Sequence, residues 1–131
     1  MTHQRLALVS LLVPDYDAAL LYYVDVLGFT PCEDTVISAD KRWVVVTPPG
    51  GECGILLAKA ATTDQRAAIG KQAGGRVFLF LHTDDFARDH AAMGARGVHF
   101  VEAPRHESYG MVAVFEDPFG NRWDLIEPRH A

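Results

Sequence analysis

The sequence contains little cysteine and no long apolar segment. Its two cysteines, Cys32 and Cys53, are too few for a disulfide framework, so we expect free thiols in a reducing cytoplasm. The apolar stretch Leu6–Val13 is far shorter than the roughly 20 residues of a membrane-spanning helix. It also runs directly into Pro14-Asp15, unlike a secretory signal. We therefore expect a cytoplasmic protein without a membrane segment.

Positive charge is also scarce in this chain. It has 12 Lys and Arg against 17 Asp and Glu, which gives a formal net charge of −5. Because nucleic-acid phosphates and anionic lipids repel an acidic protein, we expect neither nucleic acid nor a membrane as a partner. The sequence also lacks a glycine-rich phosphate loop, a nucleophile elbow and a Cys-His pair, so these signatures of phosphate binding and nucleophilic catalysis are missing.

The composition that remains is that of one small folded domain. The 131 residues are enough for one domain and too few for two ordinary ones. With 49% hydrophobic and 22% charged residues, the chain can bury a core. No low-complexity tract or linker interrupts it. We therefore expect a single domain over residues 1–131.

The clearest local pattern is a hairpin near the end of the chain. Its arms, Met111–Phe115 and Arg122–Glu127, are apolar and partly alternating, as half-buried strands should be. Between them, Asp117-Pro118-Phe119-Gly120 fits a type I turn, because Asp accepts backbone hydrogen bonds, Pro fixes φ and Gly tolerates the exit geometry. This pattern predicts strand, tight turn, strand.

Strands and capped helices precede the hairpin in two similar sets. The first set comprises a strand over Leu6–Val13, a helix over Tyr16–Leu27 with Asp15 at its start and Gly28 at its end, and strands from Phe29 (interrupted by Glu33–Arg42), over Trp43–Thr47 and over Gly54–Lys59. The second set comprises a strand over Val77–His82, a helix from Asp84-Asp85 to about Arg96, a strand over Val98–Val101, a polar connection over Pro104–Gly110 and the hairpin. Between the sets, Thr62 and Gln65 form a capping box for a short helix that ends near Gly70.

The two sets match in spacing as well as in order. The distance from Asp15 to Gly28 is 13 positions, and so is the distance from Asp84 to Gly97. The two helix starts, Asp15 and Asp84, are about 69 residues apart. We therefore predict an internal repeat with the order β-α-β-β-β in each half. The expected organisation is a first module over about 1–60, a connecting helix over about 62–72 and a second module over about 76–131.

The hairpin sequence Phe-Glu-Asp-Pro-Phe-Gly-Asn-Arg-Trp-Asp-Leu-Ile-Glu resembles the closing hairpin of the vicinal oxygen chelate (VOC) superfamily. That group includes glyoxalase I, bleomycin-resistance proteins, fosfomycin-resistance enzymes, extradiol dioxygenases and methylmalonyl-CoA epimerase. The resemblance extends over nearly the whole chain. It implies an α+β fold in which two βαβββ modules form curled mixed sheets around a cup, and a homodimer. It does not select an activity, because one scaffold carries many chemistries.

Metal-dependent members place a His or Glu on four strands, where the metal binds two vicinal oxygens of the substrate. Carried onto this sequence, the first position falls at Leu8, the second at Gly54 or Leu56, the third at Phe78 or Val77 and the fourth at Asp124. Only Asp124 can ligate a metal. We therefore predict no cofactor. A divalent metal at a displaced site built from Glu52, His82 and Asp124 stays open, although a histidine at a strand end more often bonds to the backbone.

The residues expected to line the cup are more informative than the missing ligands. They are apolar or aromatic with a few polar groups, as in a small-molecule site. The predicted ligand-contacting residues are Leu8, Trp43, Leu56, Phe78, Phe80, His82, Tyr109, Arg122 and Asp124. Tyr109 belongs to a connection that borders the cup in relatives, with Arg105 and His106, although a polar surface loop is an equal interpretation. If Asp124 is buried without a metal, we expect Arg122 or a cation of the ligand as its partner.

Three functions are compatible with this pattern. The first is a metal-independent binding protein of the bleomycin-resistance type that holds an aromatic or planar small molecule. The second is a lyase, isomerase or dioxygenase with a displaced metal or none. The third is a structural or regulatory dimer without a ligand, in which aromatic side chains fill the cup. The sequence favours the first, because three of the four metal positions carry no ligand.

Overall fold

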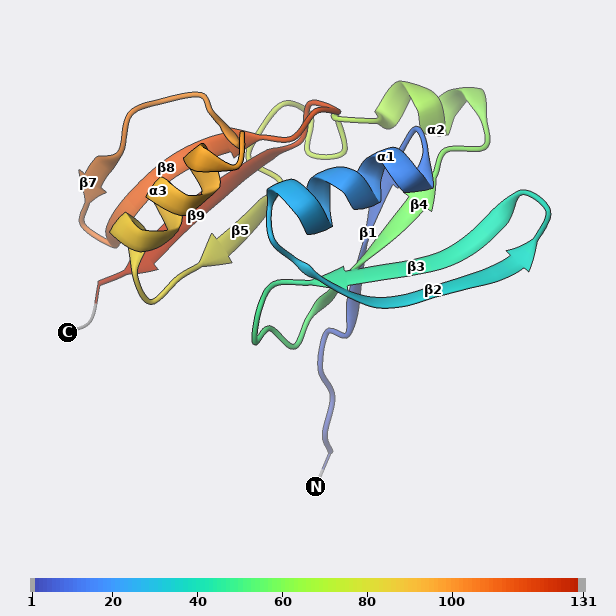
Figure 1. The fold of residues 1–131 in the computed structure, drawn as a ribbon, viewed down its shortest axis with the longest axis horizontal. Helices are drawn as coiled ribbons and strands as arrows, with labels where there is room; N and C mark the ends of the chain where they lie inside the picture. Colours follow the sequence, from blue (N-terminus) through green and yellow to red (C-terminus); the bar gives the residue numbers. More distant parts are fainter. Residues whose placement is uncertain (1, 130–131) are drawn as a thin grey trace. The chain divides into compact units, whose positions relative to one another are not determined.

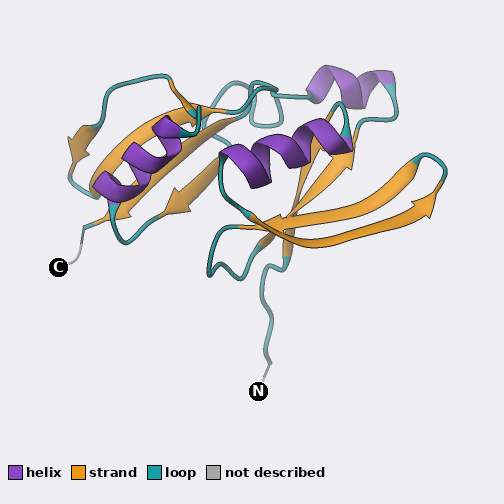
Figure 2. Cartoon of the chain, viewed as in Figure 1, coloured by secondary structure: helices purple, strands orange, loops and turns teal. Residues whose placement is uncertain are grey.

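The computed structural model describes residues 2–129 and divides them into two units (Figures 1 and 2). Unit 1 extends to Ala67 and unit 2 begins at Ala68. Each unit has its own sheet, with a helix following the first strand of that sheet. The predicted α+β class with mixed sheets is therefore confirmed.

The sheet of unit 1 has four strands in the order β1-β4-β3-β2. They are β1 (Leu8–Val13), β2 (Thr30–Ser38), β3 (Lys41–Thr47) and β4 (Gly54–Lys59). Strands β1 and β4 are parallel, whereas β3 is antiparallel to both of its neighbours. The side chains of one face are almost fully buried, and they include Leu11, Val13, Val44, Val46 and Leu57. Ala19 and Tyr23 of the helix that follows β1 are buried too, which places the core of unit 1 on this face.

That helix is α-helical only in its first part. Helix α1 (Tyr16–Leu20) continues as a π-helical segment, η1 (Leu21–Val26). The prediction of one α-helix over 16–27 was therefore wrong in its second half. Asp15 caps the start as predicted, since its Oδ2 accepts the Ala18 N–H at 2.9 Å. At the end, the chain leaves the helix through Gly28 at φ +90°, in the left-handed region that favours glycine.

The π-helical segment accounts for a mismatch between the two halves. In the second half the helix cap is Asp85 rather than Asp84, because the Asp85 Oδ1 accepts the Arg88 N–H at 3.0 Å. The distance from cap to glycine is then 12 positions (85 to 97), one fewer than in the first half (15 to 28). A π-helical turn holds one more residue than an α-helical turn. The repeat predicted from equal spacing thus has one extra residue in its first helix.

The second strand also differs from its prediction. The polar stretch 33–42 was expected to interrupt it, but β2 continues through Glu33 to Ser38 and pairs with β3 along its length (Figure 1). Every residue of β2 is exposed, so its side chains need not be apolar. Register shifts occur near both ends of the pairing, as is usual for bulged edge strands.

The sheet of unit 2 has the strand order β5-β9-β8-β6, with β7 also paired to β8. Its elements are β5 (Leu79–His82), α3 (Phe86–Ala95), β6 (His99–Phe100), β7 (Arg105–Glu107), β8 (Gly110–Glu116) and β9 (Arg122–Pro128). Strands β5 and β9 are parallel, and the other pairs are antiparallel. The polar connection predicted over 104–110 therefore contains a strand, whereas the strands predicted over 77–82 and 98–101 are shorter than expected.

One face of this second sheet packs against α3. A continuous series of ring contacts runs from the helix into the sheet, through Phe86, His90, Phe100, Phe115 and Trp123. Trp123 is buried and stacks on Phe115 at 5.8 Å between ring centroids. It is therefore a core residue, a role that the sequence could not assign.

The turn between β8 and β9 has the predicted chemistry. The Gly120 N–H donates to the Asp117 carbonyl at 3.2 Å, which closes the turn. The Asp117 carboxylate accepts from the Phe119 and Asn121 backbone N–H groups and from the Asn121 side-chain amide at 2.8–2.9 Å. Both Asp117 and Asn121 are buried, so these bonds fix the turn and with it the register of β9.

The connecting segment holds the helix α2 (Thr63–Ala68), close to its predicted position. Thr62 accepts the Gln65 N–H at 3.1 Å, and the Gln65 side chain accepts the Ala61 N–H at 2.7 Å. This differs from the standard capping box by one residue, because the return bond goes to Ala61 instead of Thr62. Within residues 2–129, no helix has the length and apolar character needed to cross a membrane.

Candidate functional site

The far side of the unit 1 sheet, opposite its buried core, carries a groove of about 490 Å³. Its lining includes the outward-facing side chains of three strands: Ser10 and Leu12 from β1, Trp43 from β3, and Leu56 and Ala58 from β4. The strand register brings them together, since Ser10 is paired with Leu56 and Leu12 with Ala58. These residues are exposed or half-buried, in contrast to the buried residues with which they alternate. A ligand can therefore contact an apolar strand surface here that includes an indole ring, while the charged residues Asp40, Lys41, Arg42 and Lys59 also line the groove.

Arg42 fixes the rim of this unit 1 groove. Its guanidinium contacts Asp17 at 2.9 Å and Asp34 at 2.7 Å, and it lies over the Tyr16 ring at 5.2 Å from the centroid. The Arg42 backbone N–H donates to the Tyr16 hydroxyl at 3.2 Å. The hydrogen bond from Arg42 lowers the pKa of Asp34, so this pair stays ionised at neutral pH. The helix and the β2–β3 hairpin are thereby joined beside the groove.

Three of the predicted ligand-contacting residues belong to unit 1. Trp43 and Leu56 line the groove, whereas Leu8 lies on the same face beyond it, opposite Gly54. That these residues contact a ligand stays a prediction. Sequence reasoning missed Tyr16, Lys41 and Gln65 at the groove. Lys41 could have been found, because it lies two residues before Trp43 on β3 and its side chain therefore points to the same face.

The other predicted residues belong to unit 2. On β5 and β9, Phe80 is paired with Asp124, and Asp124 is paired in turn with Val114 of β8. These three side chains share the face turned away from α3, which we call the far face of unit 2. Phe78 and His82 lie on the same side of β5, and Arg122 lies on the same side of β9. The far face is polar at its margins, because His82 and Arg122 are exposed.

Asp124 is the one acidic residue on the far face that is deeply buried. Only 6% of it is exposed, and its Oδ1 atom has no hydrogen-bond partner among residues 2–129. Burial raises the pKa of Asp124, the charge of Arg105 opposes this rise, and the charge of Glu102 adds to it. A carboxylate in this position is poorly compensated when it is ionised.

The two arginines near Asp124, Arg105 and Arg122, form hydrogen bonds with other acidic residues. Arg122, one of the two partners expected for Asp124, donates instead to Glu116 at 3.3 Å across the β8–β9 pair, which leaves a cation of the ligand as the other expected partner. Arg105 donates to Glu102 at 3.0 Å, to Glu107 at 2.6 Å and to the Tyr109 hydroxyl at 3.5 Å. Tyr109 is thus one of three residues that contact the Arg105 guanidinium, a contact that the sequence alone did not indicate.

The strand registers also place the four positions where metal-dependent relatives carry ligands. Leu8 is paired with Gly54, and the Phe78 N–H donates to the Arg122 carbonyl at 2.8 Å, two residues before Asp124. A Cβ added at Gly54 would lie 2.8 Å from both Leu8 Cδ2 and Val45 Cγ1, so a side chain at this position would require its neighbours to shift. In the described part of the chain, no three His, Cys, Asp or Glu side chains form a group able to hold a metal ion.

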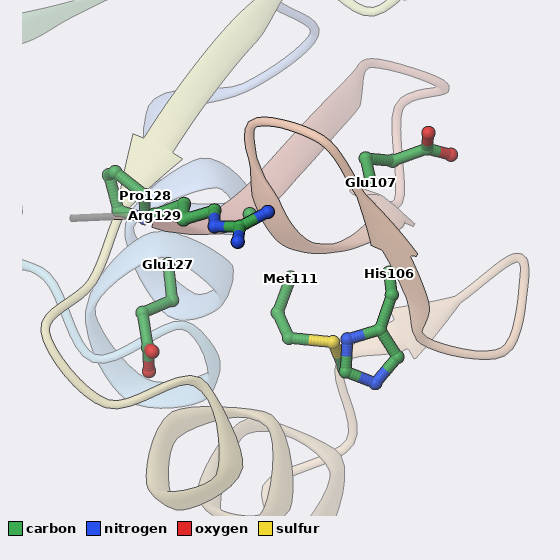
Figure 3. A pocket seen from close by; sticks show the side chains of 7 residues that line it. His106, Glu107, Met111, Glu127, Pro128 and Arg129 are labelled. Atoms are coloured by element: carbon green, nitrogen blue, oxygen red, sulfur yellow. The ribbon is translucent and has the colours of Figure 1, made fainter. Parts of the chain in front are cut away.

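A second hollow, of about 370 Å³, lies at the end of the β8–β9 hairpin (Figure 3). His106 and Met111 are strand partners there, and their side chains point toward one another in Figure 3. Its carboxylate Glu127 already has a structural role, because its Oε1 accepts the Phe86 N–H at 2.8 Å at the start of α3. The residues that line this hollow include no Phe, Tyr or Trp, and none of the predicted ligand-contacting residues is among them.

Comparison with known proteins gives a consistent result. The family model described as the Glyoxalase/Bleomycin resistance protein/Dioxygenase superfamily matches residues 5–125. An uncharacterized protein of Shewanella frigidimarina is 52% identical over 126 residues, which cover 95% of this chain and 93% of that protein.

Two solved structures are similar over almost the whole chain. UcmS2 has a TM-score of 0.83 with 29% identity, covering 96% of this chain and 99% of its own. TnmS3, described as an antibiotic binding protein from Streptomyces sp. CB03234, has a TM-score of 0.78 with 30% identity, covering 98% and 99%.

Proposed function

We propose, given that the chain belongs to the Glyoxalase/Bleomycin resistance protein/Dioxygenase superfamily, that it is a binding protein for a small, planar, largely apolar molecule. The ligand would lie in the unit 1 groove, with one ring against Trp43 and its edge against Leu56. This function requires no reaction of the ligand. It is the sequestering type of activity within the superfamily rather than the catalytic type.

The apolar groove is the observation that carries this proposal. Its volume of about 490 Å³ lies within the range of roughly 300–1,000 Å³ that is usual for small-molecule sites. An exposed apolar surface of this kind favours ligands that remove it from water, by about 25 cal/mol for each Å² of apolar area buried. A planar aromatic ligand fits best, because stacking on an indole adds roughly 0.5–1.5 kcal/mol beyond area burial.

The similarity to TnmS3 supports the same proposal. That protein is described as antibiotic-binding, and it matches nearly the whole chain at 30% identity. We extend to this chain only the general property of binding a small molecule. The residues of the unit 1 groove, rather than the similarity, suggest that the ligand is planar and apolar.

We further propose that binding does not use the family's metal. The residues at the expected positions do not fit one: no side chain at Leu8, at Gly54 or Leu56, or at Phe78 or Val77 carries a donor atom. One carboxylate, Asp124, remains of the usual set, and a single ligand does not hold a divalent ion against water.

The proposal is tested by titrating the protein with a panel of planar aromatic compounds, such as water-soluble naphthalene, acridine and anthraquinone derivatives. Tryptophan fluorescence reports binding, because Trp43 lines the groove. We expect at least one member of the panel to quench this fluorescence saturably. Calorimetry should then show that Trp43→Ala weakens its binding about tenfold or more, since stacked aromatic residues dominate such sites.

Trp123→Phe is the matched control for this titration. Trp123 is buried against Phe115 on the helix-covered face of unit 2, so its replacement should leave the affinity unchanged once circular dichroism has verified folding. The proposal fails if no member of the panel binds saturably. It also fails if Trp43→Ala binds as tightly as the unmodified protein.

Two expectations from the sequence accompany this proposal. We propose a homodimer, as the family resemblance implies, and Val36 and Ile37 on the edge strand β2 are exposed apolar residues that a second copy could cover. Sedimentation velocity would measure the mass directly, and a monomer at all concentrations would contradict it. Residence in the cytoplasm stays a prediction.

A further inference from the structure

Asp124 is buried on the far face of unit 2 without a compensating group. Its Oδ1 atom is inaccessible and has no hydrogen-bond partner within residues 2–129. A buried carboxylate in a folded protein is normally paired or hydrogen-bonded, because the charged form loses its hydration. The turn carboxylate of Asp117, at the end of the same strand pair, shows the usual arrangement, with three donors at 2.8–2.9 Å.

The surrounding charges leave this part of the far face negative. Asp124, Glu102 and Glu107 contribute three carboxylates, and Arg105 contributes one guanidinium that donates to the two glutamates. Arg122 is paired with Glu116 and so adds no net charge. Glu102 is close enough to disfavour ionisation of Asp124, and the charge of Arg105 does not offset the effect of burial. A positive group beside Asp124 would supply the missing charge.

An aromatic ring lies directly beside this carboxylate. Phe80 is the strand partner of Asp124 and points to the same face, and 61% of it is exposed. The exposed phenylalanine leaves apolar surface in contact with water, and the buried acid beside it has lost its hydration. An organic cation would cover the ring and compensate the charge. A cation gains roughly 0.5–1 kcal/mol over an aromatic face at an exposed site, and the organic part of the ligand can stack on the ring.

We infer that the far face of unit 2 is a binding site for an organic ammonium group, which the charge of Asp124 attracts while Phe80 contacts the hydrocarbon attached to it. The carboxylate that stands at a metal-ligand position of the family would then bind an amine in place of a metal. A protonated amine is favoured over a hydroxyl, because Asp124, Glu102 and Glu107 contribute three carboxylates here and Arg105 contributes one guanidinium. This site lies within unit 2 and does not depend on the unit 1 groove.

Three compounds with the same ring system test the inference. They are 1-naphthylmethylamine, which is an ammonium at pH 7, the neutral 1-naphthalenemethanol and the anionic 1-naphthoate. Binding is measured by equilibrium dialysis and located by the backbone amide shifts of ¹⁵N-labelled protein. We expect the ammonium to bind at least tenfold more tightly than the other two, with the largest shifts at Phe80, Val114 and Asp124.

Variants of the far face separate this site from an unspecific attraction of cations. Asp124→Asn should abolish the preference for the ammonium, and Phe80→Ala should weaken ammonium binding about threefold. Phe80 is largely exposed, so its truncation leaves folding intact and keeps the inference testable if the Asp124 variant is unstable. Asp84→Asn is the matched control. It removes one exposed negative charge of unit 2 before α3, where Arg88 stays bonded to Asp89, and it should change binding less than twofold.

Equal affinities for the three compounds would overturn the inference. So would an ammonium preference that survives in both Asp124→Asn and Phe80→Ala, or one that is lost only in Trp43→Ala, because the compound would then occupy the unit 1 groove. The proposed function is judged separately by the aromatic panel, so the two ideas can fail independently.

Discussion

Phe80 and Asp124 are direct partners in the parallel β5–β9 pair, yet the apolar ring is 61% exposed and the carboxylate is 6% exposed. This reverses the usual distribution, in which charge faces water and hydrocarbon is buried. Asp124 gains no hydrogen bond at Oδ1 in return among the described residues. Reversals of this kind tend to occur where a protein binds something, since selection for stability alone would remove them.

The first prediction concerns the stability of Asp124→Asn. The pKa of Asp124 is raised in the folded protein, so the folded state binds a proton more tightly than the unfolded state does. The stability that Asp124 contributes is therefore complete below its unfolded pKa of about 3.9 and is lost as the pH rises through the folded pKa. The Asn variant lacks this loss and should be up to about 1 kcal/mol more stable at pH 7, because it leaves no unpaired buried charge.

Urea denaturation at several pH values between 4 and 8 measures this difference. The advantage of the Asn variant should grow as the pH rises from 4. Asp84→Asn serves as the control, since Asp84 is exposed and its partner Arg88 stays bonded to Asp89, so its replacement should give no such growth. An Asp124→Asn variant that is less stable than the unmodified protein at pH 7 would show that the carboxylate is compensated after all.

The second prediction concerns the turn before β9. Asp117 is buried and accepts three hydrogen bonds that fix the turn. Asp117→Ala should lower the free energy of unfolding by roughly 3 kcal/mol, because it leaves buried donors without an acceptor. Pro118→Ala is the control. This neighbour is exposed, and its replacement should cost less than about 1 kcal/mol through a more flexible unfolded chain. Equal losses in the two variants would contradict the role of the carboxylate.

The third prediction concerns the space at Gly54. An added Cβ would meet Leu8 Cδ2 and Val45 Cγ1, each at 2.8 Å. Leu8 is partly exposed and can rotate away, whereas Val45 is buried and stiff at χ1. Gly54→Ala should therefore cost about 1–3 kcal/mol, as overpacking does. In double-mutant cycles, Val45→Ala should reduce the cost of Gly54→Ala by roughly 1 kcal/mol, whereas Leu8→Ala should hardly change it. If only Leu8→Ala relieved the cost, the clash would be with Leu8 rather than with Val45, and the prediction would be wrong.

The fourth prediction concerns metal ions. Protein purified without an affinity tag and then exposed to Zn²⁺, Mn²⁺, Fe²⁺ or Ni²⁺ should retain well under one ion per chain by elemental analysis. Its melting temperature should stay unchanged, because a ligand that does not bind the folded state cannot stabilise it. Retention of about one ion per chain that Asp124→Ala abolishes would point to a displaced metal site and to the enzymatic alternative.

The sequence predicted the parts of the fold that depend on local chemistry. Asp15 caps a helix and Asp117 closes a turn, because each supplies hydrogen bonds that the neighbouring backbone needs. The strand over Gly54–Lys59 was predicted with its correct ends, since its apolar residues are bounded by polar and glycine residues. Such signals are contained in a few adjacent residues and need no knowledge of the rest of the chain.

The sequence did not predict features that depend on exposure or on distant partners. The strand β2 is exposed along its whole length, so its polar residues from Glu33 onward carry no hydrophobic periodicity. The π-helical segment has no separate signal in the sequence that distinguishes it from an α-helix. At the candidate sites, the face of Asp124 could be predicted from strand alternation, but the engagement of Arg122 by Glu116 and of Arg105 by Glu102 could not.

The central claim, that a planar ligand lies in the unit 1 groove, is tested most directly by locating a bound ligand in solution. The measurement is the change in amide and indole chemical shifts of ¹⁵N-labelled protein on saturation with the tightest-binding member of the aromatic panel. We predict the largest changes at the Trp43 indole, Leu56 and Ala58, which line the groove. Changes confined to residues outside the groove, such as those around Met111 in the second hollow, would contradict the account.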